Sequence, residues 1–396
     1  MRHCMRSGAS EKHADLHMNT NCFLRLTPAQ FLRRHWQKKP LLVRGALTEY
    51  ASFIDRAGLC ELAARDDVVS RLVMRTRAGW EVRHGPFKPA LLRKLPPRGW
   101  SLLVQGVNHV VPRAASLLQE FRFLPYARLD DIMVSYAPPG GGVGPHFDSY
   151  DVFLLQGHGT RRWSVSAQRD LELVPDAPLR ILERFHADDE WLVEPGDLLY
   201  LPPRCAHDGV ALDDCITISI GFRAPSTAEI TARFLEHLQD TREPQGRYAD
   251  PSLAPAAHPA QIGADMVKKF ARMLEAIRWS RSDVTRFAGV YLTEPKPHIV
   301  FERPSRPLAR SGFIRAATRH GVRLAPTSLM LFRGRTFFIN GESCPVDAPT
   351  ARMLRRLADD RRLTLPLDCE AAALELLHEW YRAGYLLVGA SGEAVA

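Results

Sequence analysis

Long apolar runs are absent from this chain of 396 residues. No stretch approaches the roughly 18 consecutive apolar residues that a membrane-spanning helix needs, so we expect no membrane partner. The first 22 residues are polar and lack the apolar centre of a secretory signal, which argues against export. These two absences favour a cytoplasmic protein.

Paired cysteine spacings are also missing. The chain has seven cysteines, an odd number, and their spacing matches no disulfide framework. Reduced thiols are the simplest interpretation, in keeping with the cytoplasm. We expect Cys205 to be a small packing residue rather than a ligand or a redox switch. Internal repeats are absent as well.

Composition and charge are those of a soluble globular protein, with 45% apolar and 24% charged residues. The length predicts two or three domains. The net charge of +9 would suit contact with RNA or an acidic surface. Much of this excess is scattered arginine, such as Arg352, Arg355 and Arg356, and solvated helix faces are the favoured explanation.

Four segments follow from the composition and the turn signals. Residues 1–22 are expected to be a disordered leader, and Met18 is a second candidate start. Residues 23–225 form a predicted jelly-roll domain, and residues 226–305 a helical region with a Pro-, Gly- and Ala-rich linker at 244–262. Residues 306–396 combine helices with a hairpin turning at Gly334, which is typical of a winged-helix-like module.

The jelly roll is predicted from closely spaced short strands separated by Pro and Gly turns. The fold class is therefore α+β, with a double-stranded β-helix of the cupin type at its centre. The expected strands are Ile132–Tyr136, Val152–Gln156, Arg161–Val165, Trp191–Val193, Asp197–Leu201 and Cys215–Phe222.

The C-terminal module could bind DNA through a helix, but its best candidate argues against this. The helix at Glu370–Trp380 carries Glu370, Glu375 and Glu379, and acidic residues repel phosphates. We therefore expect no direct binding of nucleic acid.

A metal site is indicated just after the glycine-rich turn at 140–144. Alternate side chains of a strand share a face, so His146 and Asp148 emerge together. His207 follows a proline-rich turn and supplies a third donor. Two imidazoles and one carboxylate on one side of an ion are typical of non-haem Fe(II) oxygenases, which leave positions open for 2-oxoglutarate and dioxygen.

The distal carboxylate of 2-oxoglutarate needs a cation inside the barrel. Strand parity gives Arg161 the same face as Trp163 and Val165, so Arg161 is expected to point inward and Arg162 outward. Thr217 and Ser219 alternate with isoleucines on the last strand. They form either a small polar cradle for the co-substrate or a solvent-facing stripe, and both alternatives stay open.

Each of these signals is weak alone, because a His-x-Asp pair is common by chance and a loop histidine needs no metal. Their conjunction with both turns and with Arg161 favours the metal site.

The stretch from Gly140 to Trp163, GGGVGPHFDSYDVFLLQGHGTRRW, resembles the bacterial JmjC-type, cupin-like ribosomal oxygenases that hydroxylate an arginine of large-subunit ribosomal protein L-sixteen. The resemblance covers most of the chain from about Leu26. The leader and the last residues, 390–396, have no counterpart. Further segments that carry the resemblance are RHWQKKPLLVRG at 34–45, SLLVQGVNH at 101–109, EPGDLLYLPP at 194–203 and ISIGFRAP at 218–225.

This resemblance implies that His146, Asp148 and His207 bind Fe(II) and that Arg161 anchors 2-oxoglutarate. Relatives that act on other ribosomal proteins carry lysine at the anchor, so Arg161 looks like the arginyl hydroxylase subtype. The family also implies a homodimer formed through the helices after the barrel, and a winged-helix-like C-terminal domain.

The substrate implied by the resemblance is an arginine side chain, which would meet carboxylates near the pocket. The candidates are Asp130, Asp131 and Asp151, and ordinary turn aspartates explain them equally well. We expect hydroxylation of the arginine β-carbon. Two other functions are weighed against it: demethylation of N-methyl-lysine, and a non-enzymatic cupin-like regulator whose C-terminal module binds nucleic acid.

Overall fold

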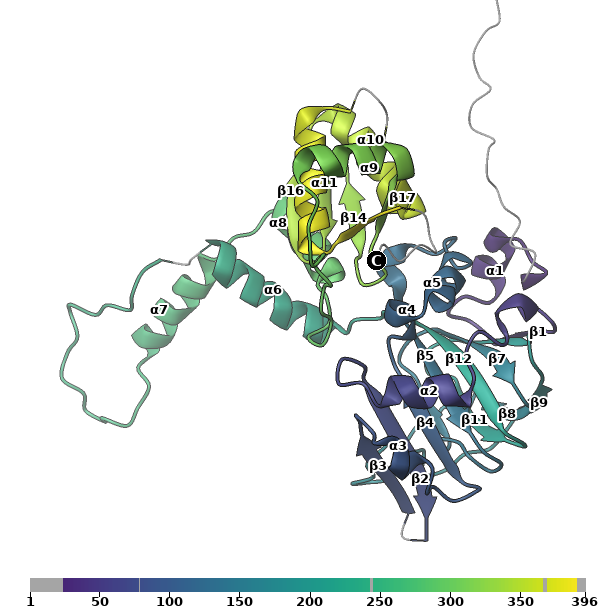
Figure 1. Cartoon of the computed structure of the whole chain (residues 1–396). Helices are drawn as coiled ribbons and strands as arrows, with labels where there is room; N and C mark the ends of the chain where they lie inside the picture. Colours follow the sequence, from purple (N-terminus) through teal and green to yellow (C-terminus); the bar gives the residue numbers. More distant parts are fainter. Residues whose placement is uncertain (1–23, 78, 243–244, 366–368, 390–396) are drawn as a thin grey trace, which may run out of the picture. The chain divides into compact units, whose positions relative to one another are not determined.

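A computed structural model describes residues 24–77, 79–242, 245–365 and 369–389 (Figure 1). The predicted leader at 1–22 lies outside the described residues. The chain divides into two compact units, Met1–Arg223 and Ala224–Ala396. Within the described ranges, no helix has both the length and the apolar character needed to span a membrane.

The first unit is built on a large antiparallel sheet of eight strands. The predicted strands at 132–136, 152–156, 197–201 and 215–222 all lie in it. Across the sheet the strands are β1 (Leu41–Val43), β10 (Leu198–Leu201), β7 (Val152–His158), β12 (Cys215–Phe222), β5 (Leu129–Ala137), β4 (Trp100–Val104), β2 (Ser70–Thr76) and β3 (Gly79–His84).

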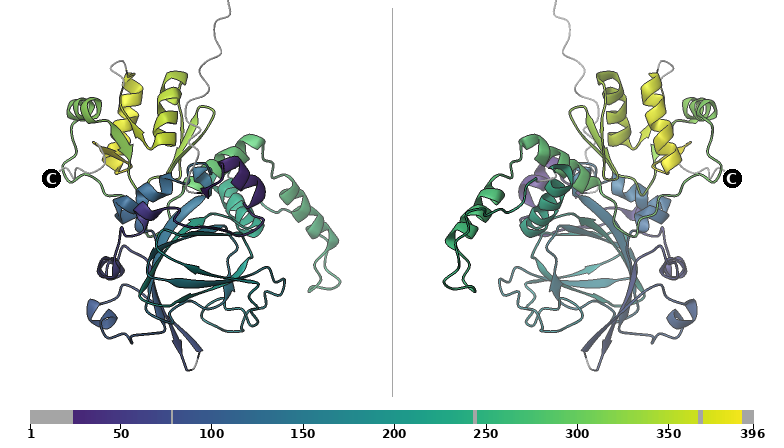
Figure 2. Two further views of the ribbon diagram at one scale, coloured as in Figure 1. Left: turned by 90° about the vertical axis from the view of Figure 1, so that its right-hand side faces the viewer. Right: turned by 90° about the vertical axis from the view of Figure 1, so that its left-hand side faces the viewer.

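A second sheet of four strands faces the first and completes the predicted jelly roll. Its strands are β6 (His146–Phe147), β11 (Ala206–Ala211), β8 (Arg161–Ser166) and β9 (Asp189–Val193). Side chains of both sheets meet in a buried interior, with Val152 and Leu154 from β7 against Trp163 and Val165 from β8. Figure 2 shows the strands curving around this interior.

The other face of the large sheet is covered by helices and carries the main apolar core. Ile216, Ile218 and Ile220 of β12 point into this core and alternate with Thr217 and Ser219, which point toward the interior of the jelly roll. The covering helices are α1 (Pro28–Arg34), α2 (Arg56–Ala63), α3 (Pro89–Leu92), α4 (Val107–Val110) and α5 (Pro112–Gln119), with short 3-10 turns η2 (Thr48–Tyr50) and η3 (Tyr126–Arg128).

Helix α1 shows how the sequence builds this layer. Thr27 caps it by accepting a hydrogen bond from the backbone N–H of Gln30, whose side chain in turn accepts one from the N–H of Thr27. Phe31 is fully buried and contacts the rings of Phe153 and Tyr200, so the helix is bound to strands β7 and β10.

The second unit begins with three helices, α6 (Thr227–Arg242), α7 (Ala264–Glu275) and α8 (Arg281–Thr293). Its remaining part joins α9 (Arg310–His320), α10 (Ala348–Asp360) and α11 (Ala371–Ala383) to two small sheets, which confirms the predicted winged-helix module. The sheets are β17 (Arg362–Leu363), β13 (Val322–Leu324) and β18 (Leu386–Val388), and β14 (Met330–Arg333), β15 (Thr336–Ile339) and β16 (Glu342–Pro345). The predicted boundary at 305/306 stays a prediction.

Candidate metal centre

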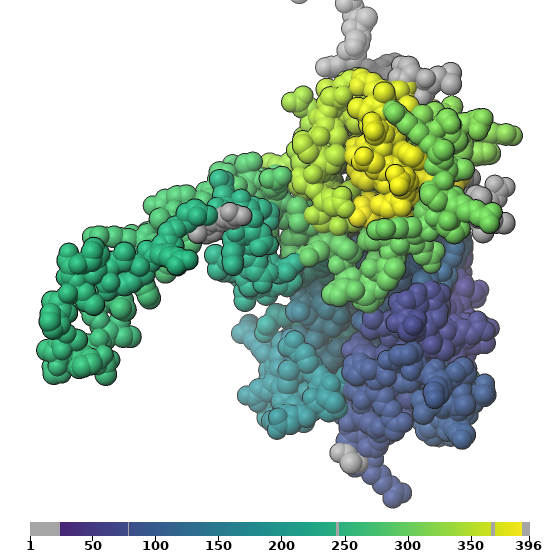
Figure 3. Space-filling view, turned by 60° about the vertical axis from the view of Figure 1, so that its left-hand side comes forward, coloured from purple at the N-terminus to yellow at the C-terminus, as the bar shows by residue number. Residues whose placement is uncertain are grey.

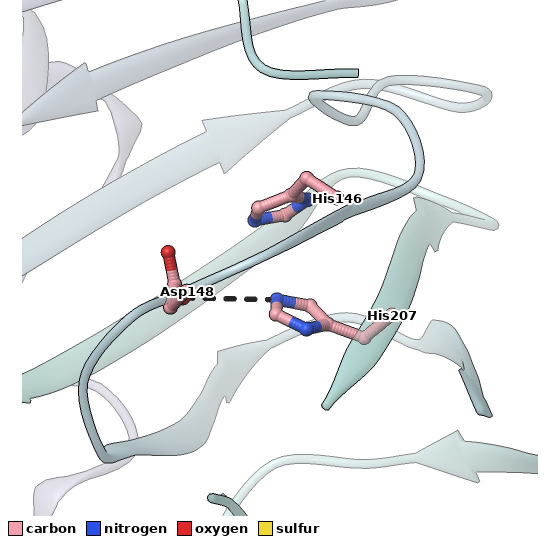
Figure 4. A group of neighbouring side chains, drawn as sticks. All are labelled: His146, Asp148 and His207. Carbon is pink, nitrogen blue, oxygen red and sulfur yellow. Dashed lines mark ion pairs between the residues drawn. The ribbon is translucent and has the colours of Figure 1, made fainter. Parts of the chain in front are cut away.

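His146, Asp148 and His207 are brought together by the pairing of two strands. β6 runs antiparallel to β11, and His146 lies directly opposite His207. The candidate ligand atoms of the three side chains all lie within 4.8 Å of one another, and His207 Nε2 is 3.9 Å from Asp148 Oδ2 (Figure 4). Two imidazoles and one carboxylate at this separation fit a divalent transition-metal ion.

Backbone carbonyl groups orient both imidazole rings. His146 Nδ1 lies 2.8 Å from the carbonyl oxygen of Gly144, and His207 Nδ1 lies 2.9 Å from that of Cys205. A carbonyl oxygen only accepts, so these contacts assign the proton to Nδ1 in each ring. Nε2 of each ring is thereby left with a lone pair for a metal, an arrangement common among metal-binding histidines.

The turn before His146 requires glycine at position 144, because two side chains approach its backbone closely. Gly144 has φ +81°, and a Cβ there would lie 2.6 Å from the Trp80 ring and 2.9 Å from Ile181. A second turn holds the carboxylate, because the backbone N–H of Arg204 donates to the carbonyl oxygen of Asp148 at 2.7 Å. Both turns predicted to flank the site therefore support its ligands.

Burial keeps His207 neutral. The residue is 2% exposed, and this burial, followed by the nearby charge of His146, lowers its pKa to about 4. The carboxylate of Asp148 and the Cys205 carbonyl act in the opposite direction but more weakly. A histidine with this pKa is an imidazole at neutral pH, which is the form that binds metals.

Arg161 points into the interior and Arg162 does not, as strand parity predicts. Arg161 is 5% exposed and its guanidinium lies 5.6 Å from the Trp163 ring centre, whereas Arg162 is exposed. Nε of Arg161 donates to Cys215 Sγ at 3.4 Å, while the buried Nη2 of Arg161 has no hydrogen-bond partner in the described structure. A buried cation with an unused donor fits the distal carboxylate of 2-oxoglutarate.

Thr217 and Ser219 are 2% and 8% exposed, so the solvent-facing alternative for them is wrong. Thr217 Oγ1 donates to Gln156 Oε1 at 3.0 Å. Gln156 Nε2 in turn lies 2.9 Å from Cys215 Sγ, the atom that contacts Arg161. Contacts through Gln156 and Cys215 thus link Thr217, on the polar face of β12, to the buried Arg161.

The three candidate substrate carboxylates have different surroundings. Asp131 is 9% exposed. It shares a face of β5 with Met133 and Ser135, which lie opposite Ser219 and Thr217 of β12. Asp130 pairs with Arg223 at 3.4 Å. Burial, followed by the charge of Asp148, raises the pKa of Tyr150, and Asp131 and Asp130 add to this effect. The Tyr150 hydroxyl, which hydrogen-bonds to Asp148, therefore lies within the electrostatic reach of Asp131 and Asp130.

Asp151 is a structural residue, which corrects its prediction as a substrate contact. It is completely buried, and its carboxylate accepts from Tyr200 Oη at 2.6 Å and Gln37 Nε2 at 3.0 Å and pairs with Arg128 at 3.2 Å. A carboxylate surrounded in this way is closed to a substrate. It instead fixes the segment that carries Asp148 and Tyr150 to the helical layer.

Comparisons with known proteins agree with this geometry. Residues 116–230 match the JmjC domain and residues 276–387 the ROXA-like winged helix. The chain is 35% identical to the ribosomal protein uL16 3-hydroxylase of Escherichia coli over 343 residues, which is 86% of this chain and 91% of that protein. This chain belongs to the ribosomal oxygenase family.

Two further relatives of this ribosomal oxygenase are informative. The probable ribosomal oxygenase of Haemophilus influenzae is 44% identical over 210 residues, about half of each chain. The structure of YcfD, a ribosomal oxygenase from E. coli in complex with cobalt and 2-oxoglutarate, matches with a TM-score of 0.77 and 33% identity, covering 92% of this chain and 98% of that one.

Three residues near the candidate ligands and Arg161 were not predicted. Tyr150 has the same strand parity as His146 and Asp148, so the pattern H-x-D-x-Y could have indicated it. Gln156 and Cys215 come together only through the pairing of β7 with β12, and no local pattern reveals them.

Removing one hydroxyl group tests whether Asp151 positions the metal ligands. Tyr200→Phe deletes a hydrogen bond to Asp151, so we expect affinity for Co(II), measured by titration calorimetry, to fall about tenfold. Tyr50→Phe is the matched control, because Tyr50 donates to Glu120 at 3.2 Å in the same helical layer. Equal Co(II) affinities of the two variants would contradict a positioning role.

Proposed function

We propose that this chain is an Fe(II)- and 2-oxoglutarate-dependent oxygenase that hydroxylates the β-carbon of an arginine in ribosomal protein uL16. The observation that carries the proposal is the cluster of His146, Asp148 and His207 in one interior with Arg161, whose buried Nη2 has no partner in the described structure. The relationship to a uL16 3-hydroxylase over nearly its full length supports the same substrate.

Fe(II) would be held by Nε2 of His146, Nε2 of His207 and a carboxylate oxygen of Asp148. When bound, it supplies the oxidation in which dioxygen gives one atom to succinate and one to the substrate, with release of CO₂. Backbone carbonyl groups aim both imidazoles, burial keeps His207 neutral, and the short turn at Arg204 holds Asp148 in place.

The 2-oxoglutarate pocket would be formed by Arg161 with Thr217 and Ser219. The planar guanidinium grips a carboxylate through two parallel hydrogen bonds, which a lysine ammonium cannot do. Cys215 and Trp163 hold this side chain against rotation, and Gln156 fixes the hydroxyl of Thr217. The co-substrate would thereby be oriented before the substrate arrives.

The arginine of the substrate would meet Asp131 and Asp130. A guanidinium pairs readily with carboxylates, and the partly exposed ring of Tyr150 offers it an aromatic face. Such pairing would orient the β-carbon toward the metal. The enzyme would act where ribosomal proteins are made, in the cytoplasm.

A homodimer is the proposed assembly, formed through the helices after the jelly roll. Helix α7 has no buried residue, although its apolar side chains recur at helical spacing. A second copy of the chain would cover this stripe. Its members are Met266, Val267, Phe270, Met273 and Leu274, all 37–68% exposed.

Loss of one ligand tests the activity. The wild-type protein with Fe(II), 2-oxoglutarate and purified uL16 should release succinate and add one oxygen atom to an arginine, detected by mass spectrometry. Asp148→Ala should abolish both, because two imidazoles alone hold Fe(II) weakly. The matched control is Asp66→Ala, which changes an exposed carboxylate on the loop between α2 and β2. Full activity of Asp148→Ala, or formaldehyde release from a methylated peptide without hydroxylation, would contradict the proposal.

Arg161→Ala tests the anchor for the co-substrate. We expect the KM for 2-oxoglutarate to rise about 100-fold, because a charge-assisted pair contributes roughly 2–3 kcal/mol. The adjacent, outward-facing Arg162→Ala is the control and should leave this KM within about twofold, as surface substitutions do. Similar KM values in the two variants would exclude Arg161 as the anchor.

Phe270→Glu tests the assembly. A charge in the centre of the α7 stripe should convert the dimer to a monomer in light-scattering measurements, because an interface core excludes charged residues. Leu192→Glu is the control, since Leu192 on β9 is 51% exposed and Phe270 is 52% exposed. A dimer that persists in Phe270→Glu would show that α7 does not form the interface.

A further inference from the structure

Basic and aromatic side chains gather at the hairpin of the winged-helix module. β14 and β15 pair from Met330 to Ile339, with Gly334 and Arg335 in the turn between them. Phe332, Arg333 and Arg335 are all exposed. Figure 3 shows the surface of this module in light green to yellow.

Helix α10 adds more arginine beside this hairpin. The helix packs against β14, and Arg355 connects the two elements: its Nη2 donates to the carbonyl oxygen of Gly334 at 2.9 Å, and its guanidinium lies 5.7 Å from the Phe332 ring centre. Arg352 and Arg356 are exposed and one helical turn apart. We name Phe332, Arg333, Arg335, Arg352, Arg355 and Arg356 together the arginine wing.

The charges of the arginine wing are only partly compensated. Within the described ranges, Arg333, Arg335, Arg352 and Arg356 make neither an ion pair nor a side-chain hydrogen bond. Four carboxylates oppose them. Asp347 interacts with the charge of Arg335, Glu370 with that of Arg352 and Asp359 with that of Arg355, and Asp360 follows Arg356 by one helical turn.

Two of these carboxylates already have partners. Asp347 accepts from the backbone N–H of Thr350 at 2.8 Å and so caps α10. A hydrogen bond to Asp347 is also the main cause of the raised pKa of Glu370. Asp359 lies one turn beyond Arg355 on α10 and, with Asp360, lowers the net charge at that end of the helix.

We propose that the arginine wing binds single-stranded RNA. Guanidinium groups match phosphate oxygens in pairs, and the exposed face of Phe332 offers a stacking surface for one base. An acidic peptide would use the arginines but not the aromatic ring. The acidic side chains that disfavour nucleic acid lie on the helix at 370–380, of which Glu370 is near Arg352, whereas the arginines of the hairpin and α10 are not part of that helix.

The test uses the full-length protein and a fluorescent single-stranded RNA of about 15 nucleotides, a length within the usual range of such sites. Arg333→Ala/Arg335→Ala and Arg352→Ala/Arg356→Ala should each weaken binding about tenfold or more in anisotropy titrations. The slope of log K against log salt should fall by about 1.4 for each pair, since each phosphate contact on a single strand contributes about 0.7. Hydroxylation of a short uL16 peptide should be unchanged in both, which confirms that the variants are folded.

The matched control is Arg315→Ala/Arg319→Ala, which removes two exposed arginines from α9 of the same module. It should change the affinity by less than about twofold. Equal weakening by control and wing variants, or a slope unaffected by the wing variants, would overturn the proposal, because the binding would then be diffuse.

Phe332→Leu separates RNA from other acidic partners. It preserves the apolar contact with Phe337 but removes the stacking face, so single-stranded RNA should bind about fivefold or more weakly while a duplex of the same length is unaffected. Single-stranded DNA of the same sequence should follow the RNA if phosphate and base stacking alone are recognised. A polyglutamate peptide that binds as tightly as RNA, or no effect of Phe332→Leu, would contradict the assignment.

Discussion

The pairing of β6 with β11 is the constraint on which the rest of this structure depends. It sets His146 opposite His207, and the alternation of side chains then gives Asp148 the same face as His146. A slip of one residue in either strand would turn an imidazole away from the site. Gly144 and Arg204 support this arrangement, because their backbone groups contact His146 and Asp148.

The interior of the jelly roll carries a cost that the proposed co-substrate explains. Burying an arginine next to Trp163 is unfavourable unless its donors are used, yet Arg161 bonds through Nε to a thiol and leaves Nη2 without a partner in the described structure. A dicarboxylate would satisfy this donor. The buried carboxylate of Asp151 needs no ligand, because it already has three partners within the protein.

Local pattern predicted the parts of this site that lie within one strand. Parity alone joined His146 to Asp148 and turned Arg161 inward. Asp151 shows the limit, because its partner Gln37 is 114 residues away and nothing in the local sequence reveals a buried pair. Strand β11 was missed for a related reason: Gly209 weakens the strand pattern but is required, since a Cβ there would lie 2.5 Å from the Trp163 ring.

The most direct test of the central claim is intact-protein and peptide mass spectrometry of uL16 from cells that carry either the wild-type gene or one encoding Asp148→Ala. The metal site formed by β6 and β11 predicts one added oxygen atom on an arginine of uL16 in the first cells and none in the second. An unmodified arginine in both, or the same modification in both, would contradict this account of the site.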